Sequence, residues 1–171
     1  MPAMVRAYIG LGSNLAAPPE QIQRALVALQ DLPDSRLVAR SRCYHSTPLG
    51  GPIQPNYVNA VAALDTRMTA HELLASLQRI EKQQGRVRTQ TRWGPRTLDL
   101  DILLYGDWQL AESALTIPHP ALSQRDFVLY PLQEIAPGLI IPGLGSLLDC
   151  IGKCPRRGLQ ALDWQGEPKA G

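Results

Sequence analysis

Long apolar runs are missing from this chain. No stretch of about 20 apolar residues occurs, so the sequence predicts no membrane-spanning helix. Residues 1–15 lack the charged start, apolar run and cleavage site of a secretory signal. An excess of one charge is missing too, because 17 Lys and Arg face 15 Asp and Glu, which disfavours a general nucleic-acid or membrane-surface binder. We therefore expect a cytoplasmic protein without nucleic-acid or membrane partners.

Cysteine and aromatic residues are scarce. Cys43, Cys150 and Cys154 form no disulfide framework, and two thiols one helical turn apart make a poor metal site without further ligands. We interpret all three as reduced thiols. Aromatic residues are 5% of the chain, with one phenylalanine, so the stacking platform of an RNA-binding sheet is thin.

Common phosphate-binding and nucleophile motifs are also absent. Neither a P-loop nor the protein-kinase motifs occur, and no Ser-His-Asp or Cys-His set competes for a catalytic role. Gly10 and Gly12 follow a strand-like segment, but the segment through Leu15 lacks the lysine and spacing of a phosphate-cradling loop. We interpret it as a structural turn.

The hydrophobic pattern, by contrast, is that of an ordinary globular domain. With 171 residues, 44% of them apolar, the chain is expected to form one domain with a substantial core. Alternating and helical periodicities give the order strand, helix, strand, strand, helix, strand, which predicts a ferredoxin-like α+β sandwich, an antiparallel sheet with helices packed on it. The strands are expected at 5–11, 36–44, 57–64 and 98–105, the helices from Pro18 and after a capping box at Thr69, and the last 20 or so residues are expected to be irregular.

The most informative segment is a strand that carries two acids, Asp99 and Asp101. Strand side chains alternate, so both carboxylates point to one side, roughly 7 Å apart, while their apolar neighbours enter the core. Two such carboxylates repel each other unless a cation lies between them. Magnesium is suited, because it prefers one or two carboxylates, waters and phosphate oxygens, and two ions can clamp a phosphoryl group. A solvated strand face or a salt bridge to nearby arginines is the alternative.

A basic loop precedes this strand. Residues 85–96 contain Arg86, Arg88, Arg92 and Arg96, whose planar guanidinium groups suit phosphates. Trp93, in the same loop, offers a flat face for a heterocycle. A solvated loop, or one that binds single-stranded nucleic acid, is the alternative interpretation. This loop and the proline-rich segment 46–56 are placed to close over substrates.

Together these segments resemble the 6-hydroxymethyl-7,8-dihydropterin pyrophosphokinase family. The strongest match is Arg86-Val-Arg88 followed by Arg92-Trp-Gly-Pro-Arg-Thr-Leu-Asp-Leu-Asp-Ile102. Supporting matches are residues 8–15, Tyr57-Val-Asn59 and Ile117-Pro-His119. The resemblance covers about residues 6–145 and departs from the pattern at Ser46, Thr89 and Ala114.

The resemblance implies a monomeric enzyme that moves diphosphate from ATP to the pterin with two Mg²⁺ ions. Asp99 and Asp101 would hold the metal and, with Arg86 and Arg96, would be catalytic. The ATP side would be lined by Leu74, Gln78, Glu81, Arg88, Trp93, Arg96, Ile102, Thr116 and His119. The pterin would be held by Ser46, Thr47, Leu49, Tyr57, Asn59, Trp93 and Phe127. Asn59 suits that role, because an amide both donates to and accepts from a pterin edge.

Two other functions fit parts of the pattern. A nucleotidyl transferase or cyclase also places paired aspartates on a sheet with two metals. A ferredoxin-like RNA-binding module would use the basic loop without needing Asp99 and Asp101.

Overall fold

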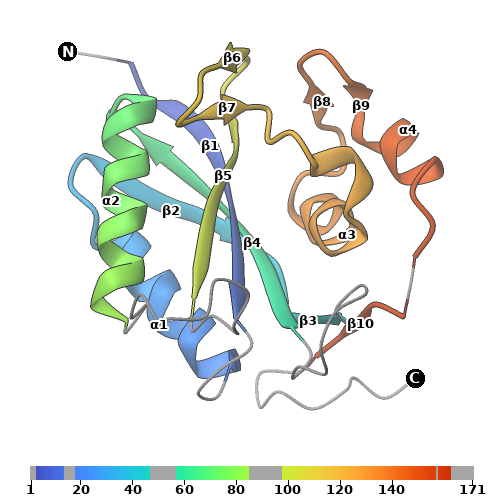
Figure 1. Ribbon diagram of the computed structural model, residues 1–171, viewed down its shortest axis with the longest axis horizontal. Coiled ribbons are helices and arrows are strands. Elements are labelled where there is room, and N and C mark those ends of the chain that lie inside the picture. The colour runs from blue at the N-terminus through green and yellow to red at the C-terminus, as the bar shows by residue number, and fades with distance from the viewer. Residues whose placement is uncertain (1–2, 14–17, 47–56, 85–97, 157, 163–171) are drawn as a thin grey trace.

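The fold is built on one antiparallel sheet. The computed structural model describes residues 3–13, 18–46, 57–84, 98–156 and 158–162 (Figure 1). The sheet has the order β10-β3-β4-β1-β5, and β2 also pairs with β4. Its strands are β1 (Val5–Ser13), β2 (Ser35–Arg40), β3 (Tyr44–Ser46), β4 (Tyr57–Thr66), β5 (Asp99–Tyr105) and β10 (Gln160–Ala161). The order of β1, β2, β4 and β5 with their two intervening helices confirms the predicted ferredoxin-like α+β sandwich.

Two helices cover one face of the sheet, α1 (Pro18–Gln30) and α2 (Ala70–Gln83) (Figure 1). The apolar face of each helix is buried. It consists of Ile22, Ala25, Leu26 and Leu29 in α1 and of Leu73, Leu77 and Ile80 in α2. They pack against alternate residues of the strands, Leu98, Leu100 and Ile102 among them, in the larger of the two core clusters. Both helices were therefore correctly placed by their periodicity.

A second helical layer covers the opposite face, and sequence reasoning missed it. It contains α3 (Asp126–Ile135), which packs on β4, and α4 (Leu147–Gly152), which packs on α3 (Figure 1). Tyr8, Val61 and Ala63 of the sheet belong to the same core cluster. Pro118, Pro120 and Pro131 favour short elements in this part of the chain, yet α3 continues through Pro131. An interior proline costs a helix about 3 kcal/mol. Burial of Val128, Leu129 and Leu132, worth about 1.5–3 kcal/mol each, outweighs that cost.

Short elements outside the main sheet follow β5, with β6 paired to β7 and β8 paired to β9. They are β6 (Leu110–Ala111), β7 (Thr116–Ile117), the 3-10 turn η1 (Leu122–Gln124), β8 (Ile140–Ile141) and β9 (Gly145–Ser146). Within the last 20 residues, which were expected to be irregular, Gln160 and Ala161 pair with His45 and Tyr44.

The strand expected at 36–44 is interrupted, so that β2 and β3 are separate strands along β4. At Ser41 the side-chain Oγ accepts the Val61 amide, 2.9 Å away. At Arg42 the backbone amide turns to the Glu134 carboxylate on α3, 2.8 Å away. At the break, side chains thus accept backbone amides that would otherwise bond to a neighbouring strand. The alternation of apolar residues does not predict this.

Among the described residues, no helix is long and apolar enough to cross a bilayer. Cys43, Cys150 and Cys154 are buried, and the structure shows no disulfide bond among them. Burial raises the pKa of the Cys43 thiol to about 11, which makes it a poor nucleophile at neutral pH.

The capping box at the start of α2 provides a test of the fold. The Thr69 hydroxyl accepts the Glu72 amide, and the Glu72 carboxylate accepts the Thr69 amide. We expect Thr69→Ala to lower the free energy of unfolding by about 1 kcal/mol, because it leaves a helix-terminal amide without its acceptor. Urea denaturation measures the change. Thr69→Ser is the matched control and should retain most of the stability; equal losses for both would contradict the capping role.

Candidate active site

A row of paired residues crosses the sheet on the face that carries α3. Asp99 of β5 pairs with Gly12 of β1, Gly12 pairs with Asn59 of β4, and Asn59 pairs with Tyr44 of β3. Directly paired residues project to the same face of a sheet. Strands lie about 4.8 Å apart, so Asp99 and Asn59 are separated by roughly 10 Å, with only a glycine between them. The row therefore offers an acid and an amide on either side of a shallow floor.

The two carboxylates lie side by side on β5, the edge strand of the sheet. Leu98, Leu100 and Ile102 enter the core beneath α1 and α2, while Asp101 is exposed and Asp99 is partly exposed. Asp101 forms no hydrogen bond or ion pair with any described residue. The sequence prediction that both acids share one face, away from the core, is confirmed.

A buried acid holds the strand in place between these carboxylates. Glu81 of α2 is only 5% exposed, and its Oε2 accepts the amide of Leu100 at 2.8 Å. Leu100 is the residue between Asp99 and Asp101, so this bond connects α2 directly to the acidic segment.

The floor of the row consists of glycines inside β1, and the interpretation of Gly10 to Leu15 as a turn is wrong for the residues that the structure describes. The strand continues to Ser13, because Gly10 and Gly12 pair on both sides, with β4 and with β5. A Cβ at Gly12 would lie 3.1 Å from the Asn59 Oδ1 atom, and one at Gly10 would lie 3.2 Å from the Leu103 side chain. Glycine is thus required here for close approach rather than for a turn.

The donor set fits magnesium. Two carboxylates project beside a floor that a side chain at Gly12 would obstruct. Among the described residues, no group of three or more His, Cys, Asp or Glu side chains is arranged to hold a metal. The pair Asp99 and Asp101 matches an ion that takes one or two carboxylates and completes its shell with waters and phosphate oxygens.

The segment between β7 and α3 runs beside the edge strand. His119 donates its backbone amide to the Leu103 carbonyl of β5, 3.0 Å away, and its Nδ1 accepts the Ala121 amide at 3.1 Å. Burial lowers the pKa of His119, Asp101 opposes that shift, and Arg125 adds to it. With Nδ1 accepting, the neutral ring presents Nε2–H as a donor near Asp101. Thr116 lies on β7, where its hydroxyl donates to the Glu112 carbonyl.

The remaining residues expected on the ATP side lie around β5 on the α2 face. Leu74 is partly buried against the core, Gln78 is exposed on α2, and Glu81 and Ile102 are buried. The structure therefore does not bring these side chains onto the face of Asp99 and Asp101. The residues expected on the ATP side therefore lie on both sides of the edge strand β5.

The residues expected to hold the pterin that the structure describes come from β3, β4 and α3. Tyr57 and Asn59 lie on the same face of β4, and Phe127 lies in the first turn of α3, with the Arg125 guanidinium 5.5 Å from its ring centroid. Ser46 ends β3 opposite Tyr57. The other expected residues lie outside the described part of the chain: Thr47, Leu49, Arg86, Arg88, Trp93 and Arg96.

Sequence reasoning overlooked the glycine floor and a polar cluster beside it. Glu134 of α3 accepts the amide and Nε of Arg42, at 2.8 and 3.1 Å, and the hydroxyl of Tyr44. Burial, and then the bond to Glu134, raises the pKa of Tyr44 to about 12. Alternating glycines in a strand pattern are a readable signal, whereas Glu134 is 92 residues from Arg42 and gives none.

The fold and this face define a ferredoxin-like α+β protein with an acidic, glycine-floored site at the edge of its sheet. The sequence profile of the 7,8-dihydro-6-hydroxymethylpterin-pyrophosphokinases matches residues 8–137. The chain belongs to this family, and it is therefore a pyrophosphokinase, a diphosphotransferase.

Relatives named 2-amino-4-hydroxy-6-hydroxymethyldihydropteridine pyrophosphokinase extend over most of the chain. The protein of Pseudomonas aeruginosa is 53% identical over 92% of this chain and 96% of its own length. The protein of Haemophilus influenzae is 53% identical over 81% and 86%, and that of Methylorubrum extorquens is 40% identical over 94% and 100%.

Solved structures share the fold. A structure of HPPK-DHPS in complex with substrates superposes with a TM-score of 0.73 at 11% identity, over 95% of this chain and 47% of the other. Plasmodium falciparum HPPK-DHPS with pteroate gives 0.71 at 12% identity, over 88% and 42%. This chain thus spans about half the length of those longer proteins, and at such identity the likeness shows the fold.

Adding one methyl group at Gly12 tests the close packing of the glycine floor. We expect Gly12→Ala to move the Asn59 side chain, because the new Cβ would lie 3.1 Å from its Oδ1 atom. The free energy of unfolding should change by less than about 1 kcal/mol, since the Cβ meets the end of one side chain and glycine itself is unfavourable in a strand. The Asn59 side-chain amide resonances report the movement.

Gly138→Ala is the matched control, because nothing lies within 4 Å of a Cβ there. An unmoved Asn59 amide in Gly12→Ala would show that the close packing of this floor does not position the amide.

Proposed function

We propose that the chain transfers the diphosphate of ATP to 6-hydroxymethyl-7,8-dihydropterin, giving the pterin diphosphate and AMP, in folate biosynthesis. The names of its relatives support this reaction, one of them a folic acid synthesis protein of Schizosaccharomyces pombe that is 39% identical. The observation that carries the proposal is the row Asp99, Gly12, Asn59, which separates a carboxylate suited to metal-bound phosphates from an amide suited to a pterin edge.

The proposed roles rest on the family resemblance and on the chemistry of each side chain. Asp99 and Asp101 would hold two Mg²⁺ ions, whose charge neutralises phosphate oxygens during transfer. Asn59 would hydrogen-bond the pterin edge, and the rings of Tyr57 and Phe127 would stack on it. The remaining assignments keep their proposed roles, with Leu74, Gln78, Glu81, Arg88, Trp93, Ile102, Thr116 and His119 toward ATP and Ser46, Thr47 and Leu49 toward the pterin.

In the proposed step the hydroxymethyl oxygen of the pterin attacks the β-phosphorus of ATP. The bond between that phosphorus and the α–β bridging oxygen breaks, AMP leaves with the oxygen, and the hydroxymethyl proton passes to solvent. Such transfers need little covalent help from a protein, so positioning and neutralisation of charge carry the rate. Arg86 and Arg96 would supply cationic hydrogen bonds to the phosphates.

The same proposal includes the setting of the enzyme. We infer that it works as a monomeric, single-domain cytoplasmic protein without nucleic-acid or membrane partners. The near-balanced charge of 17 basic and 15 acidic residues supports this inference.

The direct test incubates the protein with ATP, Mg²⁺ and the pterin alcohol and separates the products. AMP and a pterin diphosphate in equal amounts are expected. Pyrophosphate release would instead indicate a nucleotidyl transferase or cyclase. Tight RNA binding that is independent of Asp99 and Asp101 would indicate an RNA-binding module.

Replacing either acid tests the metal assignment. We expect Asp99→Asn and Asp101→Asn to lower turnover on the order of 10³-fold or more, because each removes a negatively charged oxygen ligand. Stability of Asp101→Asn should stay level or rise, since one of two like charges is removed and Asp101 has no described partner to lose. Steady-state kinetics and urea denaturation measure both effects.

Asp107→Asn is the matched control, because Asp107 is an exposed acid in the turn that follows the same strand. Near-normal turnover in either Asp99→Asn or Asp101→Asn would refute the metal site.

The proposed role of Arg86 in the chemical step can be measured separately from its effect on ATP binding. We expect Arg86→Ala to slow the chemical step on the order of 10³-fold, or ~4 kcal/mol, as for other arginines that serve phosphoryl transfer. ATP affinity should change far less, because an interaction made mainly in the transition state lowers kcat. Single-turnover kinetics beside equilibrium ATP binding measure the two. A collapse of affinity with a normal single-turnover rate would make Arg86 a ground-state clamp.

A further inference from the structure

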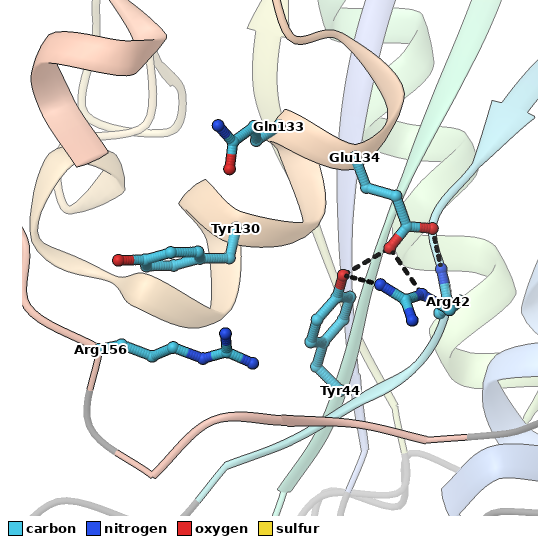
Figure 2. Close-up of a pocket in the computed structure, with 6 residues that line it drawn as sticks. All are labelled: Arg42, Tyr44, Tyr130, Gln133, Glu134 and Arg156. Atoms are coloured by element: carbon cyan, nitrogen blue, oxygen red, sulfur yellow. Dashed lines mark hydrogen bonds and ion pairs between the residues drawn. The ribbon is translucent and has the colours of Figure 1, made fainter. Parts of the chain in front are cut away.

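A second pocket lies at the opposite end of the row from Asp99, with Tyr44 as one wall (Figure 2). It has a volume of about 330 Å³ and lies between β3, the C-terminal half of α3 and the segment that follows α4. This volume is at the lower end of the range for small-molecule sites. Its lining contains none of the residues assigned to ATP, metal or pterin: it consists of Arg42, Tyr44, Tyr130, Gln133, Glu134 and Arg156.

The single acid of this lining is already neutralised. The Glu134 carboxylate accepts three hydrogen bonds, two of them from Arg42 and one from the Tyr44 hydroxyl. Among the described lining residues, Arg42 offsets the charge of Glu134, and Arg156 supplies the remaining positive charge. A ligand with one negative charge would complete the balance.

Arg156 is held in place yet has donors to spare. Its Nε donates to the Leu159 carbonyl, 3.0 Å away, and its guanidinium carbon lies 5.4 Å from the ring centroid of Tyr130. Figure 2 shows the terminal nitrogens directed into the space below Tyr130 and toward Tyr44. Among the described residues, no carboxylate lies within ion-pair distance of Arg156. Two terminal amino groups therefore remain for a carboxylate, which a guanidinium binds through paired hydrogen bonds.

The rest of the lining offers the edges of two aromatic rings and an amide. Tyr44 is only 4% exposed and has the Arg42 guanidinium over its ring, while Arg156 lies over one face of Tyr130. The Gln133 amide is positioned along the upper edge of the space that these two rings border (Figure 2). Aromatic rings stack or pack edge to face on tyrosine, and the amide can donate to or accept from a ring substituent.

We propose that this pocket binds a small aromatic carboxylate, with the carboxylate on Arg156 and the ring packed against the exposed edges of Tyr44 and Tyr130. The proposal is independent of the reaction assigned to the chain. Phosphate shares the affinity for arginine but has more charge than the pocket balances and no ring for the tyrosines.

The test titrates the full-length protein with sodium benzoate and follows the Gln133 side-chain amide by NMR. Saturable binding is expected, with a Kd of about 1 mM or tighter for so small a ligand. Cyclohexanecarboxylate keeps the charge without the aromatic face, and benzamide keeps the ring without the charge. Each should bind at least about tenfold more weakly. Inorganic phosphate should not displace benzoate.

Two variants locate the site. Arg156→Gln, at an exposed position where folding is not at risk, should raise the Kd for benzoate at least about tenfold. Arg24→Gln removes an exposed guanidinium from α1, away from the pocket, and should leave the Kd unchanged. Non-saturating benzoate, equal binding of phosphate, or equal effects of the two substitutions would each overturn the proposal.

Discussion

The pairing of β1 with both of its neighbours is the constraint on which the site depends. Gly12 and Gly10 pair with Asp99 and Asp101 on one side and with Asn59 and Val61 on the other. A slip of one residue would exchange the two acids with Leu100 and Ile102 and turn both carboxylates into the core. Burying two carboxylates in an apolar core is far more costly than losing any single apolar contact, so the core pattern of β5 fixes the register that the chemistry needs.

An irregularity in β5 separates the part of the strand that serves the site from the part that serves the core. The register with β1 shifts between Tyr8 and Ile9, opposite Leu103. Beyond this bulge, Leu103 and Leu104 both join the cluster beneath α3, whereas Leu100 and Ile102 belong to the cluster beneath α1 and α2. A bulge re-aims side chains in this way, and bulges are common beside active sites. The acids can therefore remain exposed on the same face that α3 seals a few residues further on.

Sequence patterns predicted the first layer and the acids, because those features repeat locally. Alternation located β4 and β5, helical periodicity located α1 and α2, and the capping box at Thr69 marked a true helix start. The layer of α3 was not predictable in this way, since Pro131 argues against a helix and only burial against β4 compensates. The glycine floor was misinterpreted because Gly-x-Gly more often marks a turn; only the pairing on both sides shows why Gly12 lacks a side chain.

Helix α3 connects the two sites on this face. Phe127, Tyr130 and Glu134 are spaced by three and four residues, so they form one stripe of the helix. Its first residue lies toward the proposed pterin site, and the other two line the second pocket. On the sheet, Asn59 belongs to the proposed pterin site, and its paired residue Tyr44 lines the second pocket. Glu134 bonds both Arg42 and Tyr44, so α3 is tied to β3 beside the Arg156 pocket. The strand pair and the helix stripe thus each contribute one residue to the proposed pterin site and at least one to the Arg156 pocket.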